Sequence, residues 1–503
     1  MARTPQIQPQ IPPQIPLQVP PQPPSRRLDA WLLGTALLVA LLLRVQLALR
    51  SSGLTMDSGL YVRMAEDLLA GTRGPSPAHH GYPLLLALAS RLLPGRELPG
   101  RVLSCVASLA LVAMVWSVAR RRAPAWGALV PTLLVALHPL LAVYGTAIMT
   151  EATFLALGLG GVALLDADRP RTGGALLGAA WWVRPEAALI APLAVLLTPL
   201  DWRRRLLVLL IAAGVALPYS VLLRIEQGHW SLTPKTVLVR APFVGAREAE
   251  WRLADRTAFA DSVGLRVRLA RDGAAIVRAY PTRLGEQLKP LLAAWPALLL
   301  VGSLLGLLRA AGRGPWLAFA ALPFVYPLLA APADLRFAQL ALPALVLPFA
   351  SGAGSFVRAP RAALAMTSAA ALVGLLLVWV GPAGRLALAF DDGPMTAMRG
   401  AGMWLAQHTP GNAVIMDRKS YVAFFARRQH VQLPDEPLDT LLTYARASGA
   451  THIVVEEYVV RSLRPQLLPL LDSGALARER RVRLVFTARP APGDGVAVLE
   501  VVR

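Results

Sequence analysis

The stretch MDSGLYVRMAEDLLAG, residues 56–71, lies between the first two apolar segments of the chain, and HHGYPLLLAL, residues 79–88, follows it. Apolar residues recur in the first stretch at helical spacing, while Arg63, Glu66 and Asp67 fall on the opposite face. The expected apolar face consists of Tyr61, Met64, Ala65, Leu68 and Leu69. Because an amphipathic helix joined directly to apolar segments favours the plane of a membrane interface, we predict an interfacial helix with Asp57 at its N-terminus.

The composition around this stretch is that of a membrane protein with many spans. The chain has 503 residues, 55% of them hydrophobic, and a mean hydropathy of +0.50. Many apolar runs are long enough to cross a bilayer core of about 30 Å. Cys105 is the single cysteine, so an intrachain disulfide is excluded.

The net charge of +21 rests almost wholly on arginine, because lysine occurs only at Lys235, Lys289 and Lys419. The arginines cluster in short links between apolar runs. The positive-inside rule and anionic lipid explain such clusters better than a nucleic-acid partner does. We therefore expect membrane lipids, and no nucleic acid, to contact these arginines.

We expect an α-helical polytopic membrane domain of about eleven helices. The expected spans lie near residues 29–48, 99–119, 125–144, 148–166, 172–183, 186–199, 205–224, 288–309, 315–332, 337–352 and 362–381. This count puts the arginine clusters on one side, which is the cytoplasmic side by the positive-inside rule. The N-terminus is then cytoplasmic and the C-terminus lies outside.

The same reading divides the chain into three parts. Residues 1–28 form a disordered Pro/Gln-rich cytoplasmic arm, and residues 29–384 form the transmembrane domain. This domain carries two large outer loops, at residues 50–98 and 225–287, and the second is expected to contain amphipathic helices. From residue 385 to 503 helical and strand patterns alternate, which predicts a small α/β domain outside the membrane.

The sequence Arg184-Pro185-Glu186 interrupts a long apolar segment. Each half is too short for a full span, so we predict two short helices that meet at the outer side. Charge at membrane depth is tolerated where protein or a wet cavity surrounds it, and Arg184 and Glu186 are therefore expected to line a cavity. A local ion pair at a hairpin tip is the alternative.

Several motifs follow one another along the chain. They are D-x-x-x-Y-x-x-x-A-x-x-L at 57–68, GYPLLLAL at 81–88, TE at 150–151, RPE at 184–186 and DLRF at 334–337. Their order and the expected topology resemble the GT-C glycosyltransferases, and within these the bacterial branch related to protein O-mannosyltransferases and the lipid A aminoarabinose transferase. The resemblance covers residues 30 to 380.

The resemblance implies an inverting transfer of a sugar from a polyprenyl-phosphate donor to a lipid, glycan or protein acceptor. The reaction is expected on the outer face of the bacterial cytoplasmic (inner) membrane. It needs a base for the acceptor hydroxyl and cations for the departing phosphate.

By position, Asp57 matches the first-loop catalytic acid of the family and is predicted to be the general base. A helix N-cap is the alternative, because aspartate at that place satisfies free amides. Glu151 is expected near the same surface, where it would orient the acceptor or help to hold a metal. Thr150-Glu151 at a helix start is also common capping chemistry.

Arg184, Lys235 and Arg336 are the predicted cations for the donor phosphate, each at the outer end of a span. An ion pair with Asp334 is the alternative for Arg336, and a solvated loop position is the alternative for Lys235. His80 is a further phosphate candidate, although two adjacent histidines in a loop are more often polar surface. The predicted sugar pocket consists of Tyr61, Tyr82, Glu186 and Asp334.

A divalent metal ion is left open as a cofactor, because Asp57 and Glu151 alone are too few ligands to predict a site. Two other classes of function are also open. A secondary transporter would have broken helices with charges at depth, although inverted repeats are not evident. A non-catalytic envelope assembly protein would use its C-terminal domain to bind a partner.

Overall fold

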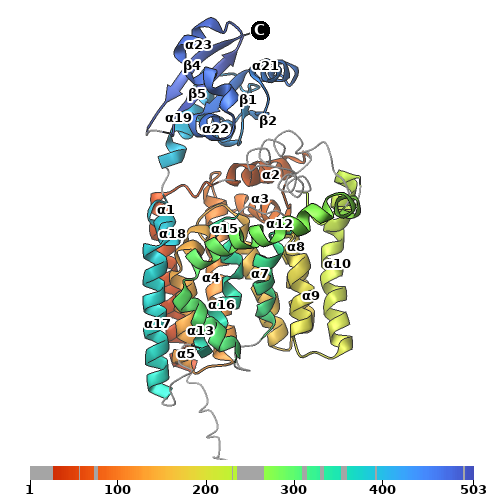
Figure 1. Cartoon of the computed structure of the whole chain (residues 1–503), viewed down its shortest axis with the longest axis vertical. Helices are drawn as coiled ribbons and strands as arrows, with labels where there is room; N and C mark the ends of the chain where they lie inside the picture. Colours follow the sequence, from red (N-terminus) through yellow and green to blue (C-terminus); the bar gives the residue numbers. More distant parts are fainter. Residues whose placement is uncertain are drawn as a thin grey trace, which may run out of the picture.

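The computed structural model describes residues 26–55, 57–72, 78–228, 230–234, 265–308, 314–328, 333–352, 360–390, 393–490 and 493–502. The N-terminal arm up to residue 25 and the loop residues 235–264, which include Lys235, lie outside these ranges. Figure 1 shows a bundle of helices with the C-terminal α/β unit, residues 393–502, beyond one of its ends.

Four helices of the described residues are long and apolar enough to cross a membrane. They are α1 (Arg26–Arg50), α4 (Leu98–Arg120), α10 (Trp202–Gln227) and α17 (Pro360–Val380). A bent pair, α12 (Leu265–Ala294) and α13 (Ala297–Leu308), makes a fifth span if it is counted as one. These helices support a membrane protein, whereas the expected count of eleven spans is not confirmed.

The rest of the bundle consists of shorter helices. They are α2 (Ser58–Ala70), α3 (Gly81–Ser90), α5 (Ala125–Leu137), α6 (Pro139–Tyr144), α7 (Thr150–Asp166), α8 (Pro170–Val183), α9 (Ala187–Leu197), η4 (Pro315–Ala321), α14 (Leu322–Val325), α15 (Leu335–Ala338), η5 (Gln339–Ala341), α16 (Leu342–Gly352) and α18 (Pro382–Leu388). The predicted pair of short helices around Arg184-Pro185-Glu186 is confirmed as α8 and α9.

Prolines break two spans that we expected to be continuous. The segment 125–144 is two helices, because His138, before Pro139, is in an extended conformation. The segment 288–309 is not one straight helix: α12 ends at Ala294, before Trp295-Pro296, and α13 leaves at an angle of 99°. In Figure 1, α12 runs across the bundle near the end that faces the C-terminal unit.

Helix α2 lies at that same end of the bundle (Figure 1), and its bounds agree with the periodicity of residues 56–71. Tyr61, Met64 and Ala65 are buried, as expected. Leu68 and Leu69, which we expected on the same apolar face, are exposed.

The C-terminal unit is built on a sheet of five strands in the order β2-β1-β3-β5-β4. The strands are β1 (Val414–Asp417), β2 (Gln429–Gln432), β3 (His452–Glu456), β4 (Val482–Ala488) and β5 (Val496–Val501). Strands β1, β2 and β3 are parallel, with Ile415 opposite His452, while β5 is antiparallel to both β3 and β4.

Helices cover both faces of this sheet. They are α19 (Gly393–His408), α20 (Tyr421–Ala426), α21 (Leu438–Ala447), α22 (Glu457–Ser462), η6 (Pro465–Leu471) and α23 (Ser473–Arg478). Alternate residues of β3 point to opposite sides: Val454 packs with the α19 and α20 core, and Ile453 and Val455 with the α21 and η6 core. This arrangement confirms the predicted α/β layers and places α20 next to the helix bundle.

Candidate active site

Asp57 directly precedes α2, but its side chain does not cap the helix. One carboxylate oxygen, Oδ2, lies 3.2 Å from Nη1 of Arg336, and the other, Oδ1, lies 3.0 Å from Nζ of Lys419. The side chain of Asp57 is 12% exposed. Its carboxylate is thus directed at two cations from distant parts of the chain, and the capping alternative does not describe it.

A second acidic residue, Glu151, lies in the first turn of α7 and is fully buried. Its Oε1 is 2.8 Å from Nη1 of Arg184, in the break between α8 and α9. Nη1 of Arg184 also donates to the Thr150 hydroxyl at 3.0 Å, and Nη2 donates to Glu186 at 2.7 Å. Arg184 therefore joins two buried carboxylates, and the local pair with Glu186 is one half of this arrangement.

Arg336 connects the two acidic residues predicted from the sequence. Its Nη1 binds Asp57, and its Nε lies 3.7 Å from Oε1 of Glu151. Asp334 caps α15 by accepting from the backbone N–H of Arg336 at 2.8 Å, so a backbone contact takes the place of the side-chain ion pair that was the alternative for Arg336. The guanidinium also lies 4.7 Å from the ring centre of Phe337.

We call the six connected residues Lys419, Asp57, Arg336, Glu151, Arg184 and Glu186 the charge chain. Cations and carboxylates alternate along it, and its members sum to zero when all are ionised. Ionised groups can be buried when each has an opposite charge and hydrogen bonds. Tyr326 extends the chain at one end, where its hydroxyl donates to Glu186 at 3.2 Å.

Two of the predicted pocket residues are part of the core below this chain. The rings of Tyr61 and Tyr82 meet edge to face, with centres 5.4 Å apart. The Tyr82 hydroxyl is fully buried and hydrogen-bonds to the Gly100 carbonyl and the Ser104 hydroxyl. Tyr61 is on α2, one turn after Asp57, and helps to hold α2 against α3.

His80 lies at the N-terminal end of α3, and its recorded ion pair is with Glu226 of α10 rather than with a member of the charge chain. The distance from Nε2 of His80 to the Glu226 carboxylate is 3.4 Å. The neighbouring His79 bonds through Nδ1 to the Trp181 carbonyl at 3.0 Å. The structure therefore places His80 beside α10, and Lys235 lies outside the described residues.

Sequence reasoning missed Lys419 as a site residue. It comes from the loop between β1 and α20 and reaches Asp57 across 362 positions of the chain. Its rarity was the available signal, since it is one of three lysines. A residue of the C-terminal α/β unit thus enters the site.

Next to Lys419, the carboxyl ends of β1 and β3 carry further buried polar groups. Burial and the neighbouring carboxylate of Asp417 raise the pKa of Glu456 to about 7, against the opposing effect of Arg418. Burial also raises the pKa of the Tyr421 hydroxyl, and the carboxylates of Asp57 and Glu456 raise it further. The carboxyl ends of these strands are therefore close enough to Asp57 for its charge to affect the Tyr421 hydroxyl beside them.

The charge chain does not form a metal site of a known kind. Among the described residues, no group of three or more His, Cys, Asp or Glu side chains is placed to hold a metal ion. Arg336 lies against both Asp57 and Glu151, where a metal would need their oxygens. These residues do not fit a divalent ion in this arrangement, and we derive no step through one.

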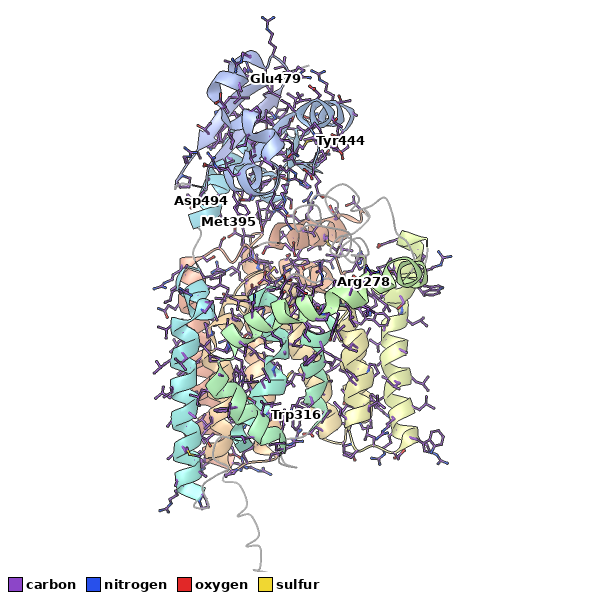
Figure 2. All side chains as sticks on the ribbon, viewed as in Figure 1. Arg278, Trp316, Met395, Tyr444, Glu479 and Asp494 are labelled. Carbon is purple, nitrogen blue, oxygen red and sulfur yellow. The ribbon has the colours of Figure 1, made fainter. Side chains whose placement is uncertain are left out.

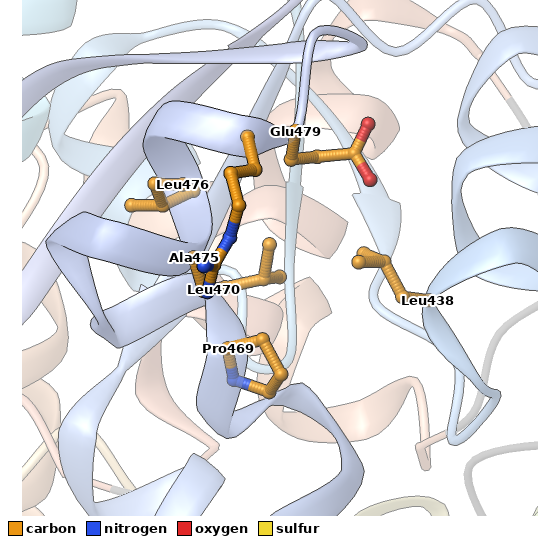
Figure 3. Close-up of a pocket in the computed structure, with 7 residues that line it drawn as sticks. Leu438, Pro469, Leu470, Ala475, Leu476 and Glu479 are labelled. Carbon is orange, nitrogen blue, oxygen red and sulfur yellow. The ribbon is translucent and has the colours of Figure 1, made fainter.

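A small cavity of about 190 Å3 lies in the C-terminal unit (Figure 3). Leu438, Leu470, Leu476 and Glu479 are among the residues that line it. Figure 2 shows Glu479 on the part of this unit that faces away from the helix bundle. The cavity is therefore separate from the charge chain.

The structure resembles solved membrane enzymes at low sequence identity. Archaeal oligosaccharyltransferase AglB from Archaeoglobus fulgidus, solved with an inhibitory peptide and a dolichol-phosphate, matches with a TM-score of 0.60 and 13% identity over 94% of this chain and 74% of that one. The apo form from the same organism matches with a TM-score of 0.59 and 14% identity over 92% and 73%. ArnT from Cupriavidus metallidurans, bound to undecaprenyl phosphate, matches with a TM-score of 0.49 and 16% identity over 93% and 97%.

The two oligosaccharyltransferase structures show that this chain shares their fold. The resemblance noted in the sequence is thereby confirmed at the level of fold. No protein-family model matches the chain, and no curated protein sequence matches it.

Proposed function

We propose that this protein is a glycosyltransferase that moves a sugar from a polyprenyl-phosphate donor to a lipid, glycan or protein acceptor. The observation that carries the proposal is the contact of Asp57 with Arg336 at the start of α2, within a GT-C fold. A carboxylate and a guanidinium at one surface supply the two functions that the transfer needs, a base and a phosphate-binding cation.

In the proposed reaction, the acceptor oxygen attacks the anomeric carbon of the donor sugar from the face opposite the phosphate. A bond forms between this oxygen and the anomeric carbon, and the bond from that carbon to the phosphate oxygen breaks. The electron pair of the broken bond goes to the phosphate, and Asp57 takes the acceptor proton. The products are the glycosylated acceptor, with inverted configuration, and the polyprenyl phosphate.

Arg336 is the proposed cation for the departing phosphate, because its guanidinium already lies beside Asp57. Arg184 acts as a positioning residue, because Glu151, Glu186 and Thr150 occupy its nitrogens. Through Glu151, Arg184 holds the site of Arg336 in place.

We further propose that the site lies at the outer face of the cytoplasmic membrane. Arg122 packs over the ring of Trp316, which Figure 2 places near the end of the bundle away from the C-terminal unit. Arginines at that end favour the cytoplasmic side. The charge chain and the C-terminal unit are then outside, where polyprenyl-linked sugars are used.

The test is transfer of radiolabelled sugar from polyprenyl-phosphate donors by purified protein in detergent. Wild type is compared with Asp57→Asn and Arg336→Met, and Asp67→Asn is the matched control on the same helix. We expect Asp57→Asn to lower turnover by about 10²- to 10⁴-fold, the usual contribution of a general base. Full turnover by folded Asp57→Asn would show that another group is the base, and absence of lipid phosphate binding by wild type would reject the proposed function.

A further inference from the structure

Lys419 is the most accessible member of the charge chain. Its side chain is 37% exposed, against 13% for Arg336 and 12% for Asp57. Within the described part of the chain, its ammonium hydrogen-bonds to Asp57. An ammonium carries three N–H groups on a flexible stem, so this cation can turn to a second anion without losing its place in the site.

We propose that Lys419 is the exchangeable cation of the site, and this inference rests on the proposed function. Without donor, Lys419 pairs with Oδ1 of Asp57. When the lipid-linked donor binds, the ammonium moves to its phosphate, and Oδ1 of Asp57 becomes available to the acceptor. The C-terminal unit thus supplies a phosphate-binding residue, and arrival of the donor releases the base.

The other cations of the chain are less suited to this exchange. Arg184 is buried, and its Nε, Nη1 and Nη2 all contact Glu186, Glu151 or Thr150. Breaking these contacts would take the guanidinium away from buried Glu186 and leave buried Glu151 only its longer contact with Arg336, which is costly. Arg336 lies between Asp57 and Glu151 and holds the centre of the chain. The exchange therefore falls to Lys419.

The position of Lys419 is supported by a second contact of the C-terminal unit with the bundle. Arg96 binds Glu66 of α2 at 2.6 Å and donates to the carbonyl of Phe424 in α20, while its guanidinium lies 4.0 Å from the Phe424 ring centre. A Cβ on Gly59 would come within 3.2 Å of the Ser420 hydroxyl, so α2 and the loop that carries Lys419 approach each other closely here.

A third contact lies beside the second, because it involves the neighbouring residues Glu97 and Phe425. Arg399 of α19 pairs with Glu97 at 3.3 Å, and its guanidinium lies 4.8 Å from the ring centre of Phe425. Ion pairs and stacked guanidinium groups at residues 96–97 and 424–425 thus hold the C-terminal unit against the bundle near Lys419. The approach of Lys419 to Asp57 is therefore part of an extended interface.

The experiment measures binding of undecaprenyl monophosphate to the purified full chain in detergent. We expect Lys419→Met to bind about tenfold more weakly, as for loss of one charged hydrogen bond. Lys419→Arg keeps affinity within about threefold, because it restores a cation. Lys289→Met, an exposed lysine of α12, is the matched control and binds as wild type.

Asp57→Asn gives the sharper test, because it removes the resting partner of Lys419. If the ammonium is shared between Asp57 and phosphate, this variant binds the lipid phosphate several-fold more tightly. The double variant Asp57→Asn with Lys419→Met loses most of that gain, which a double-mutant cycle measures as coupling. Undecaprenol, which lacks the phosphate, and inorganic phosphate are each added alone. They separate recognition of the polyprenyl chain from recognition of the phosphate.

Equal affinity of folded Lys419→Met and wild type would overturn the inference, as would an equal gain from Asp57→Asn in both backgrounds. Binding of inorganic phosphate as tight as that of the lipid would overturn the assignment to a lipid donor. If folded wild type binds no lipid phosphate, the proposed function fails and this inference fails with it. If wild type binds and Lys419→Met binds equally, only the role of Lys419 is lost.

Discussion

Arginine pairs with carboxylates at both ends of the helix bundle, but the pairs Arg184–Glu151 and Arg204–Asp168 differ in how much of each side chain is exposed. At the charge chain, the side chains of Arg184 and Glu151 are 11% and 1% exposed. At the opposite end, those of Arg204 and Asp168 are 51% and 69% exposed. Exposed pairs can form and break in water, while breaking a buried pair leaves a buried charge without compensation. Burial, more than the presence of ion pairs, separates a candidate site from a charged surface.

The largest effect is expected from removing the Arg184 guanidinium, which pairs with the buried carboxylates Glu151 and Glu186. Arg184→Met removes the guanidinium beside Glu186 and leaves Glu151 only its longer contact with Arg336, so we expect a loss of about 3–5 kcal/mol in the free energy of unfolding. Denaturant unfolding in detergent measures it. Adding Glu186→Gln is expected to recover part of the loss, and a stable Arg184→Met single variant would contradict the buried pairing.

A pH series tests Glu456, a buried acid beside the charge chain. Glu456 has a pKa of about 7 in the folded protein, raised from an ordinary value of 4.5. The folded state therefore binds more protons than the unfolded state between these values, and stability falls as pH rises from 4.5 to 7. Glu456→Gln removes this fall, so above pH 7 it is expected to be more stable than wild type by about 2–3 kcal/mol.

The measurement is a series of melting curves from pH 4 to pH 8, with Glu479→Gln as an acid of the same unit that lies outside this edge. Parallel curves for wild type and Glu456→Gln would show that Glu456 does not take up a proton on folding in this range.

Loss of the Arg96 contacts between the helix bundle and the C-terminal unit is expected to have a smaller effect. Arg96→Ala removes the contacts with Glu66 and Phe424, and Lys419 then approaches Asp57 less often. We expect transfer to fall by about tenfold, as for a single charged hydrogen bond. The rate is compared with that of Arg91→Ala, which removes an arginine at the end of α3. Unchanged transfer by Arg96→Ala would show that docking does not depend on this contact.

The smallest effect is expected at the exposed end. Arg204→Met breaks the pair with Asp168, and we expect a loss of less than about 1 kcal/mol. Unfolding at low and high salt checks this value, because an exposed pair is screened. A loss as large as that of Arg184→Met would remove the distinction between the two ends.

Much of the local structure could be predicted from the sequence. The periodicity of residues 56–71 predicts α2, and the alternation of helical and strand patterns from residue 385 onward predicts the small α/β unit. Strand β2, Gln429–Gln432, was missed because its side chains are polar and it lies at the edge of the sheet. The bend between α12 and α13 was missed because the hydropathy of a long apolar run is the same whether the helix is straight or broken.

The candidate site was only partly predictable, because its contacts join distant residues. Asp57, Glu151, Arg184 and Arg336 stood out as charges at the ends of apolar segments, and the structure brings all four together. The local ion pair with Asp334, which was the alternative for Arg336, is a backbone cap instead. Nothing in the neighbourhood of Lys419 marks Asp57 as its partner, since such pairing is decided by the packing of α20 against α2.

The sequence separation of these partners also sets the order in which the ion pairs can form during synthesis. Glu151 and Arg184 are 33 residues apart, so they can pair soon after they leave the ribosome. Asp57 and Lys419 are 362 residues apart. At roughly 5–20 residues per second, the interval is about 20 to 70 seconds. Asp57 is among the first acids to be made, and it must wait in contact with water or lipid headgroups until almost the whole chain has been translated before its last counter-ion arrives.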